Sequence, residues 1–202
     1  MGSRRKSDVR QECDIAEQIA ADDVLRLLGE QGPSSISSVV EEVGDRELAF
    51  SALESLEKEG LIRTSGDRIE LTGKGKEKAN ALLVSHVTAE KLASRLGSGE
   101  PHVIAHCLEH FPESIKLLER LGSRSLVGLV QLPRGAWGYV VGILYPTPRI
   151  LARLLGAGVV PGRRITLFAS TPAAVLVIVG SSGRLIALDR RIAKAIFVVP
   201  AE

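Results

Sequence analysis

Through the first 121 residues, apolar positions recur every three or four residues, with polar positions between them. This spacing predicts amphipathic helices, because every third or fourth residue falls on the same helix face. Glycine and proline interrupt the pattern at intervals and so indicate where one helix ends and the next begins. The predicted helices cover residues 14–28, 38–44, 45–59, 74–96, 101–111 and 112–121.

Between the third and fourth of these helices, two short runs at residues 61–64 and 68–72 flank a turn that contains Gly66. Short runs around a tight glycine-containing turn predict a β-hairpin. Ser38, three residues before Glu41, and Asp45 are expected to cap the second and third helices. Three helices followed by a hairpin within about 60 residues is the order of a winged helix-turn-helix.

Beyond Ser123 the pattern changes to short apolar runs separated by glycine and proline. Such runs predict strands joined by tight turns, as in a small β-barrel. The predicted strands cover residues 137–144, 165–170, 174–179, 184–189 and 196–199, with a short helix at 148–155. We therefore expect a multi-domain α+β fold. It has a winged helix over residues 1–73, a helical domain over 74–123 and a small β-barrel over 124–202.

Charge divides the chain at the same boundary as the hydrophobic pattern. Residues 1–80 hold 12 basic and 17 acidic residues, a net charge of −5, and residues 81–123 have a net charge of −1. Residues 124–202 hold 10 basic and 2 acidic residues, a net charge of +8. A shift this sharp supports a domain boundary near residue 124. The seven aromatic residues are too few for a base-stacking platform, which argues against a single-stranded nucleic acid partner.

Composition excludes several classes of protein. With 202 residues, of which 45% are hydrophobic and 25% charged, the chain is long and apolar enough to bury a core. Cys13 and Cys107 are too few for a disulfide framework and are expected to stay reduced. No apolar run follows the basic start, and turn residues break the longest uncharged stretch, residues 165–183. We therefore expect a soluble cytoplasmic protein without a secretory signal or a membrane partner.

Imidazole and carboxylate side chains are concentrated in the predicted helical domain. All four histidines of the chain lie within 25 residues, at His86, His102, His106 and His110. Glu90 follows His86 by one helical turn, so their side chains share a face. On the next helix, one arc of about 100° holds His102, His106, Glu109 and His110. Two facing helices that carry such residues are how helical bundles build metal sites.

This set of nitrogen and oxygen ligands, without thiolate, suits Fe(II), Mn(II), Zn(II) or Co(II). A structural polar cluster without metal is the alternative interpretation. His102 and His106 have the spacing of a zinc protease motif, but Val103 stands where that motif has its glutamate base. The sequence also has no glycine-rich phosphate loop and no nucleophile elbow. We therefore expect that the protein is not an enzyme, and a metallohydrolase is the alternative from that class.

The chain resembles the diphtheria-toxin-repressor family of metal-dependent transcriptional regulators over nearly its whole length. Three motifs follow the family's order and spacing: Leu71-Thr-Gly-Lys-Gly-Lys, His86-Val-Thr-Ala-Glu90 and His102-Val-Ile-Ala-His106-Cys-Leu-Glu109-His110. The segment Leu154-Leu155-Gly-Ala-Gly-Val-Val-Pro-Gly162 is similar to the SH3-like barrel of that family and of FeoA-type iron-transport proteins. The resemblance implies a DNA-binding winged helix, a helical metal-binding and dimerisation domain, and a C-terminal SH3-like FeoA-type domain.

By position, the resemblance implies two metal sites. The first is matched by His86, Glu90 and His102, and the second, regulatory site by His106, Glu109 and His110. The family's variable ligand, commonly Cys or Glu, is His106 here. In the family the second site also takes a ligand from the first helix. That position is Ile19 in this chain, which cannot coordinate a metal, and Asp22, about one turn later, is the nearest substitute.

The function that the resemblance implies is a repressor of metal-uptake or homeostasis genes that is activated by Fe(II) or Mn(II). It would act as a homodimer on double-stranded operator DNA, and metal would favour the arrangement that binds DNA. The expected DNA contacts are Arg46 and Ser51 on the third helix and Arg63 and Arg68 in the hairpin. The alternative is a metal-independent winged-helix regulator in which the histidine and glutamate cluster is structural.

Overall fold

The structure is a computed structural model that describes residues 3–96, 101–108, 110–121, 126–144, 147–180 and 183–201. By its contacts the chain forms two compact bodies, each with its own hydrophobic core. The N-terminal body comprises Met1–Ser85 with Pro146–Arg153, and the C-terminal body comprises His86–Tyr145 with Leu154–Glu202. The three-domain division of the sequence stays a prediction. Within the described residues, no helix is both long and apolar enough to cross a membrane.

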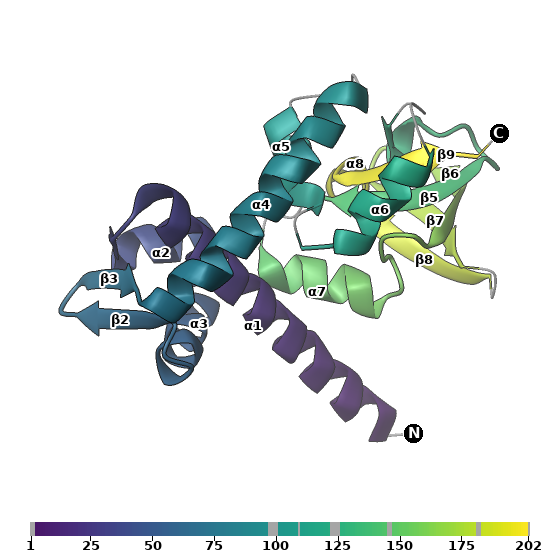
Figure 1. Cartoon of the computed structure of the whole chain (residues 1–202). Helices are drawn as coiled ribbons and strands as arrows, with labels where there is room; N and C mark the ends of the chain where they lie inside the picture. The colour runs from purple at the N-terminus through teal and green to yellow at the C-terminus, as the bar shows by residue number, and fades with distance from the viewer. Residues whose placement is uncertain are drawn as a thin grey trace. The chain divides into compact units, whose positions relative to one another are not determined.

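The N-terminal body is a winged helix-turn-helix (Figure 1). Its elements are α1 Ser3–Gln31, β1 Ser34–Ser35, α2 Ile36–Val43, α3 Arg46–Lys58, β2 Ile62–Ser65 and β3 Arg68–Leu71, after which α4 Gly73–Leu96 begins. The three strands are antiparallel in the order β1-β3-β2. The predicted three helices and hairpin are confirmed. The predicted start of the first helix near residue 14 is wrong, because the first turns of α1 are polar and carry no apolar stripe.

The two short helices of this body begin at side-chain caps. Ser35 accepts the Ser38 N–H at 3.1 Å and caps α2. The prediction that Ser38 is the cap is wrong, because Ser35 ends strand β1 and the helix begins directly at Ile36. Asp45 accepts the Leu48 N–H at 3.1 Å, so the predicted cap of α3 is confirmed. Both caps satisfy backbone donors that the first helical turn leaves without partners.

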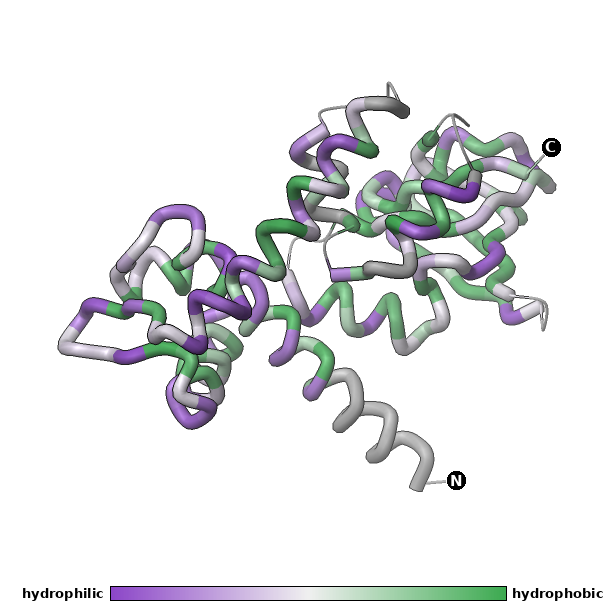
Figure 2. The backbone as a smooth tube through the Cα atoms, in the orientation of Figure 1, coloured by the Kyte–Doolittle hydropathy of each residue, from purple (hydrophilic) through white to green (hydrophobic). Residues whose placement is uncertain are grey.

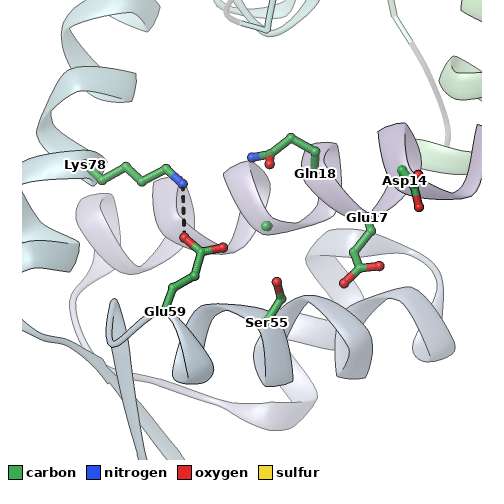
Figure 3. Close-up of a pocket in the computed structure, with 7 residues that line it drawn as sticks. Asp14, Glu17, Gln18, Ser55, Glu59 and Lys78 are labelled. Atoms are coloured by element: carbon green, nitrogen blue, oxygen red, sulfur yellow. Dashed lines mark ion pairs between the residues drawn. The ribbon is translucent and has the colours of Figure 1, made fainter. Parts of the chain in front are cut away.

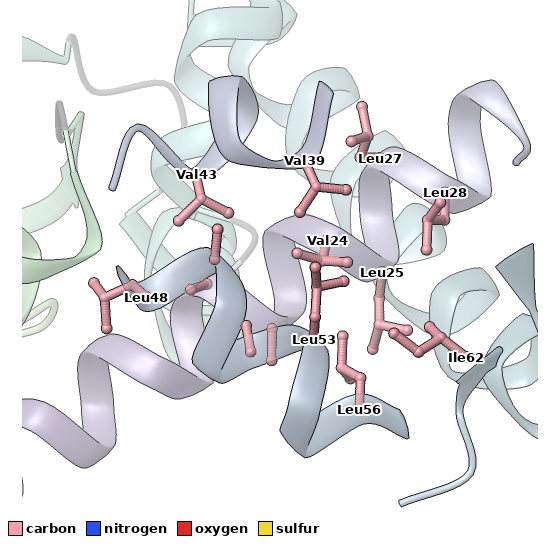
Figure 4. Close-up of a cluster of buried hydrophobic side chains, with 14 of the residues drawn as sticks. Val24, Leu25, Leu27, Leu28, Val39, Val43, Leu48, Leu53, Leu56 and Ile62 are labelled. Carbon is pink, nitrogen blue, oxygen red and sulfur yellow. The ribbon is translucent and has the colours of Figure 1, made fainter. Parts of the chain in front are cut away.

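The core of the N-terminal body lies among α1, α2, α3 and the hairpin (Figure 4). Val24 and Leu25 of α1 are fully buried, and Leu56 of α3 is 1% exposed. Burial of an aliphatic side chain of this size contributes about 1.5–3 kcal/mol to stability. Arg26 is buried beside this core and forms an ion pair with Glu42, which ties α1 to α2.

The start of α4 lies directly against the hairpin. Thr72 donates its hydroxyl hydrogen to the Gly60 carbonyl at 2.7 Å and accepts the Gly75 N–H at 3.1 Å. A Cβ atom at Gly75 would lie 1.9 Å from the Leu61 carbonyl oxygen. Only glycine allows this approach, so backbone contact fixes how α4 leaves the winged helix.

The C-terminal body combines helices with a six-stranded antiparallel sheet in the order β4-β9-β5-β6-β7-β8. After the second half of α4 come α5 Pro101–Leu108, α6 Pro112–Leu121, β4 Val127–Gly128, the 3-10 helix η1 Leu129–Gln131, β5 Trp137–Ile143, β6 Arg164–Ser170, β7 Ala174–Val179, β8 Arg184–Asp189, α8 Arg190–Lys194 and β9 Ile196–Pro200. Helix α7 Pro148–Gly156 lies between β5 and β6 in the chain, and its residues up to Arg153 belong to the N-terminal body. Its core packs Ala89 of α4 and Ala105 of α5 with Val141 and Val199 of the sheet. The predicted α+β fold class is confirmed.

Candidate functional site

Three of the predicted metal ligands come together where α4 meets α5. His86 and Glu90 lie one turn apart on α4, and His102 lies in the first turn of α5. His86 Nε2 is 3.2 Å from His102 Nδ1, and one ligand atom from each of the three residues lies within 4.8 Å of the others. His86 is buried, Glu90 is half-buried and His102 is exposed, so the group opens from the core to the surface.

This geometry fits a divalent transition metal. Metal–nitrogen bonds of about 2.0–2.1 Å place neighbouring ligand atoms about 3.0–3.4 Å apart, and the two imidazole nitrogens are 3.2 Å apart. Without metal, one imidazole donates its N–H to the other. With metal, both nitrogens would turn lone pairs to the ion, and Glu90 would supply a negative charge. Three protein ligands leave further coordination positions open for water or another ligand.

The other predicted metal ligands are not part of this group. The side chain of His106 and the whole of Glu109 lie outside the described residues. His110 is half-buried after the end of α5. Asp22 accepts a hydrogen bond from Gln18 Nε2 at 3.0 Å, and Ile19 beside it is buried. In the ranges that the structure describes, His86, Glu90 and His102 are the one group of three potential ligands at such distances.

A separate pocket of about 220 Å³ opens on the N-terminal body between α1, α3 and the first half of α4 (Figure 3). Its lining is mainly polar and consists of Asp14, Glu17, Gln18, Ala21, Ser55, Glu59 and Lys78. Lys78 Nζ lies 3.9 Å from a carboxylate oxygen of Glu59, so a lysine already balances part of the acidic charge. Its carboxylates do not form a metal-ligand group.

The residues predicted to contact DNA lie on the surface of α3 and the hairpin. Arg46 is exposed, and its guanidinium lies 5.6 Å from the ring centroid of Phe50 on the same helix. Ser51 is half-buried, and Arg63 and Arg68 are exposed on the two hairpin strands. Residues 63–68 are all exposed, and hydrophilic residues predominate along this hairpin in Figure 2. Both elements are therefore accessible to a large partner.

Arg149 of α7 contacts the N-terminal end of α3, which sequence reasoning did not predict. Its Nε donates a hydrogen bond to Asp45 Oδ2 at 2.5 Å, and its Nη2 lies 3.0 Å from Glu47 Oε2. The hydrogen bond from Arg149 holds the pKa of the Asp45 carboxyl below its ordinary value, and Asp45 in turn raises the pKa of Arg149. The partners are 104 positions apart, so no local pattern connects them.

Comparison with known proteins identifies the C-terminal part of the chain. No curated protein matches the sequence. Solved structures that are similar include T. acidophilum IdeR, with 24% identity, a TM-score of 0.42, and coverage of 91% of this chain and 97% of that one. A manganese-dependent transcriptional repressor in complex with manganese has 23% identity and a TM-score of 0.41 over 90% of this chain and 100% of that one. An iron uptake regulatory protein, FeoA, has 27% identity and a TM-score of 0.33 over 38% of this chain and 97% of its own. Residues 127–200 match the FeoA domain family, so the predicted FeoA-type C-terminal domain is confirmed.

Proposed function

We propose that this chain is a metal-responsive transcriptional regulator that binds double-stranded operator DNA. The observation that carries the proposal is the group of His86, Glu90 and His102, because two of its members lie on the helix that begins at the winged helix. A cation bound by all three would join α4 to α5. Metal binding would thus bias the arrangement of the winged helix through one continuous helix, by its higher affinity for one arrangement.

The ligand set favours Fe(II) or Mn(II), with Zn(II) and Co(II) as further candidates, because imidazole and carboxylate serve all four ions. When bound, the ion supplies two positive charges that hold the ligands together. His86 is buried and provides a fixed imidazole, whereas His102 is exposed and can be reached from solvent. The second metal site, proposed from the sequence alone, consists of His106, Glu109 and His110.

The winged helix supports the DNA-binding part of the proposal. In this motif the helix equivalent to α3 enters the major groove, and the wing contacts the backbone. Arg46 and Ser51 are assigned to the groove, and Arg63 and Arg68 to the phosphates. Repression of metal-uptake or homeostasis genes is the role we propose for this binding.

We also propose a homodimer. Val84 and Val87 on α4 are 68% and 45% exposed. Three residues apart on a helix, they share one face, which gives an apolar contact for a second copy of the chain. A dimer of winged helices would require an operator with two half-sites.

The decisive experiment compares DNA binding by the metal-free and the metal-loaded full chain. Duplexes are first enriched from a random-sequence pool with Mn(II) present, and affinity is then measured with Mn(II) or with a chelator. A coupling of typical size predicts binding about 5–150-fold tighter with metal. His102→Ala should reduce this difference, and Asn80→Ala, an exposed change on α4, should keep it.

Equal affinity with and without metal would favour a metal-independent regulator. The observation that supports this second candidate is the hydrogen bond between His86 and His102, which already joins α4 to α5 without an ion. Failure to enrich any duplex would contradict both candidates.

A further inference from the structure

The end of α3 that would meet DNA carries two carboxylates. Asp45 caps the helix, and Glu47 lies in its first turn with a side chain that is 89% exposed. Residues 1–80 have a net charge of −5, so this region lacks the positive excess that DNA binding usually draws on. Two uncompensated carboxylates at the entry to a groove would repel the phosphates on either side.

Arg149 brings a positive charge to both carboxylates. One guanidinium bridges Asp45 at 2.5 Å and Glu47 at 3.0 Å. Ala152, almost one turn further along α7, is 1% exposed and belongs to the same core as Val24 and Leu48. Packing of α7 therefore holds the guanidinium in place. Residues 146–153 belong to the N-terminal body, although they lie within the sequence range that matches the FeoA domain family.

We infer that Arg149 is a further residue of the DNA interface, which neutralises Asp45 and Glu47 at the end of α3 and so raises the affinity for duplex DNA. This inference rests on the proposed function. With α7 packed in place, Arg46, Phe50 and Glu54 on the outward face of α3 are still exposed. The segment therefore leaves the DNA-facing surface open, which favours a supporting role over an autoinhibitory one.

The test uses the metal-loaded full chain and a duplex enriched as above. Arg149→Ala should weaken binding about three- to tenfold, because two negative charges are uncovered near phosphates. Arg153→Ala removes the same charge one turn later on α7 from an exposed position and should change the affinity less than about twofold. Arg149→Lys keeps the charge and should bind nearly as the wild type does. Urea unfolding of each variant checks that it is folded.

Removal of the two carboxylates distinguishes neutralisation of their charge by Arg149 from direct contact between Arg149 and DNA. Asp45→Asn with Glu47→Gln, added to Arg149→Ala, should restore most of the lost affinity, and asparagine still caps the helix. If the loss persists, Arg149 contacts the phosphate itself and the inference is wrong. Tighter binding by Arg149→Ala would mean that α7 hinders DNA binding, which also overturns it. If the wild type binds the duplex and Arg149→Ala binds it equally well, this inference alone is wrong. If the wild type does not bind duplex DNA, the proposed function is wrong as well.

Discussion

The candidate metal group and the candidate DNA-facing surface are built in opposite ways. The three metal ligands converge, with ligand atoms within 4.8 Å of one another and one imidazole buried. The three arginines assigned to DNA, Arg46, Arg63 and Arg68, are exposed and lie on three different elements. A small ion has to be surrounded, whereas a duplex requires charges spread over a surface.

Both regions depend on helix α4, which connects them. Its first turn is pressed against Leu61 at the hairpin, and its later turns carry His86 and Glu90. A change at the start of α4 should therefore disturb both regions, whereas a change at either surface should disturb one.

The largest effect is expected for Gly75→Ala, which disrupts the contact between the start of α4 and the hairpin. The added Cβ would lie 1.9 Å from the Leu61 carbonyl oxygen, so the backbone must move. We expect a loss of about 3 kcal/mol or more in the free energy of unfolding, measured with urea. Gly73→Ala is the matched control in the same turn, because nothing lies within 4 Å of its added Cβ. It should be neutral or gain up to about 1 kcal/mol, and equal losses in both variants would contradict this account.

The next largest effect is expected when one ligand of the candidate metal group is removed. His102→Ala removes an exposed ligand and should lower the affinity of this site for Mn(II) by about 100-fold or more, since even indirect ligand partners are worth 10–100-fold. Titration calorimetry should show one fewer bound ion than in the wild type, and urea unfolding should show that the variant is still folded. Glu109→Ala should remove the other predicted ion instead. Unaltered titration by the His102 variant would mean that this group does not hold a metal.

Much of the fold could be predicted because its signals are local. Asp45 caps α3 as expected, and Gly66 lies in the turn of the hairpin. Ser35 was missed as the cap of α2 because several neighbouring serines could serve, and only pairing of β1 with β3 decides among them. The two residues of β4 and the five of α8 are too few for hydrophobic periodicity to be visible.

The candidate sites also differ in whether local sequence signals could predict them. His86 and Glu90 share a helix face by spacing alone, and His102 was grouped with them through the resemblance to the diphtheria-toxin-repressor family. The contact of Arg149 with Asp45 joins residues far apart in sequence and follows only from the packing of α7. Local spacing therefore finds ligands that share one helix, the family resemblance groups them across two helices, and neither finds a charge that only tertiary packing brings to the site.

A smaller effect is expected for a change on the DNA-facing surface, and it should not depend on the metal. Arg46→Ala should weaken duplex binding about tenfold, with metal or with a chelator, because an arginine that contacts bases or phosphates is worth about 1–3 kcal/mol. Fluorescence anisotropy with a labelled duplex measures the affinity. Lys91→Ala, an exposed change on the second half of α4, is the control and should bind as the wild type does. A loss confined to the metal-loaded protein would mean that Arg46 acts through the metal group, and the two regions would not be separable.

The smallest effect concerns the ion pair at the end of α3. Arg149 lowers the pKa of Asp45 in the folded protein, so the pair contributes stability above the ordinary aspartate pKa of about 3.9 and loses it as the pH falls through the lower folded value. Asp45→Asn keeps the cap and removes the charge. Because both side chains are partly exposed, at 20% and 40%, the wild type should exceed the variant by only about 0.5–1 kcal/mol at pH 7. Urea unfolding from pH 7 down to about pH 3 should show this gap closing. A gap independent of pH would mean that the stability difference comes from packing and not from the charge of Asp45.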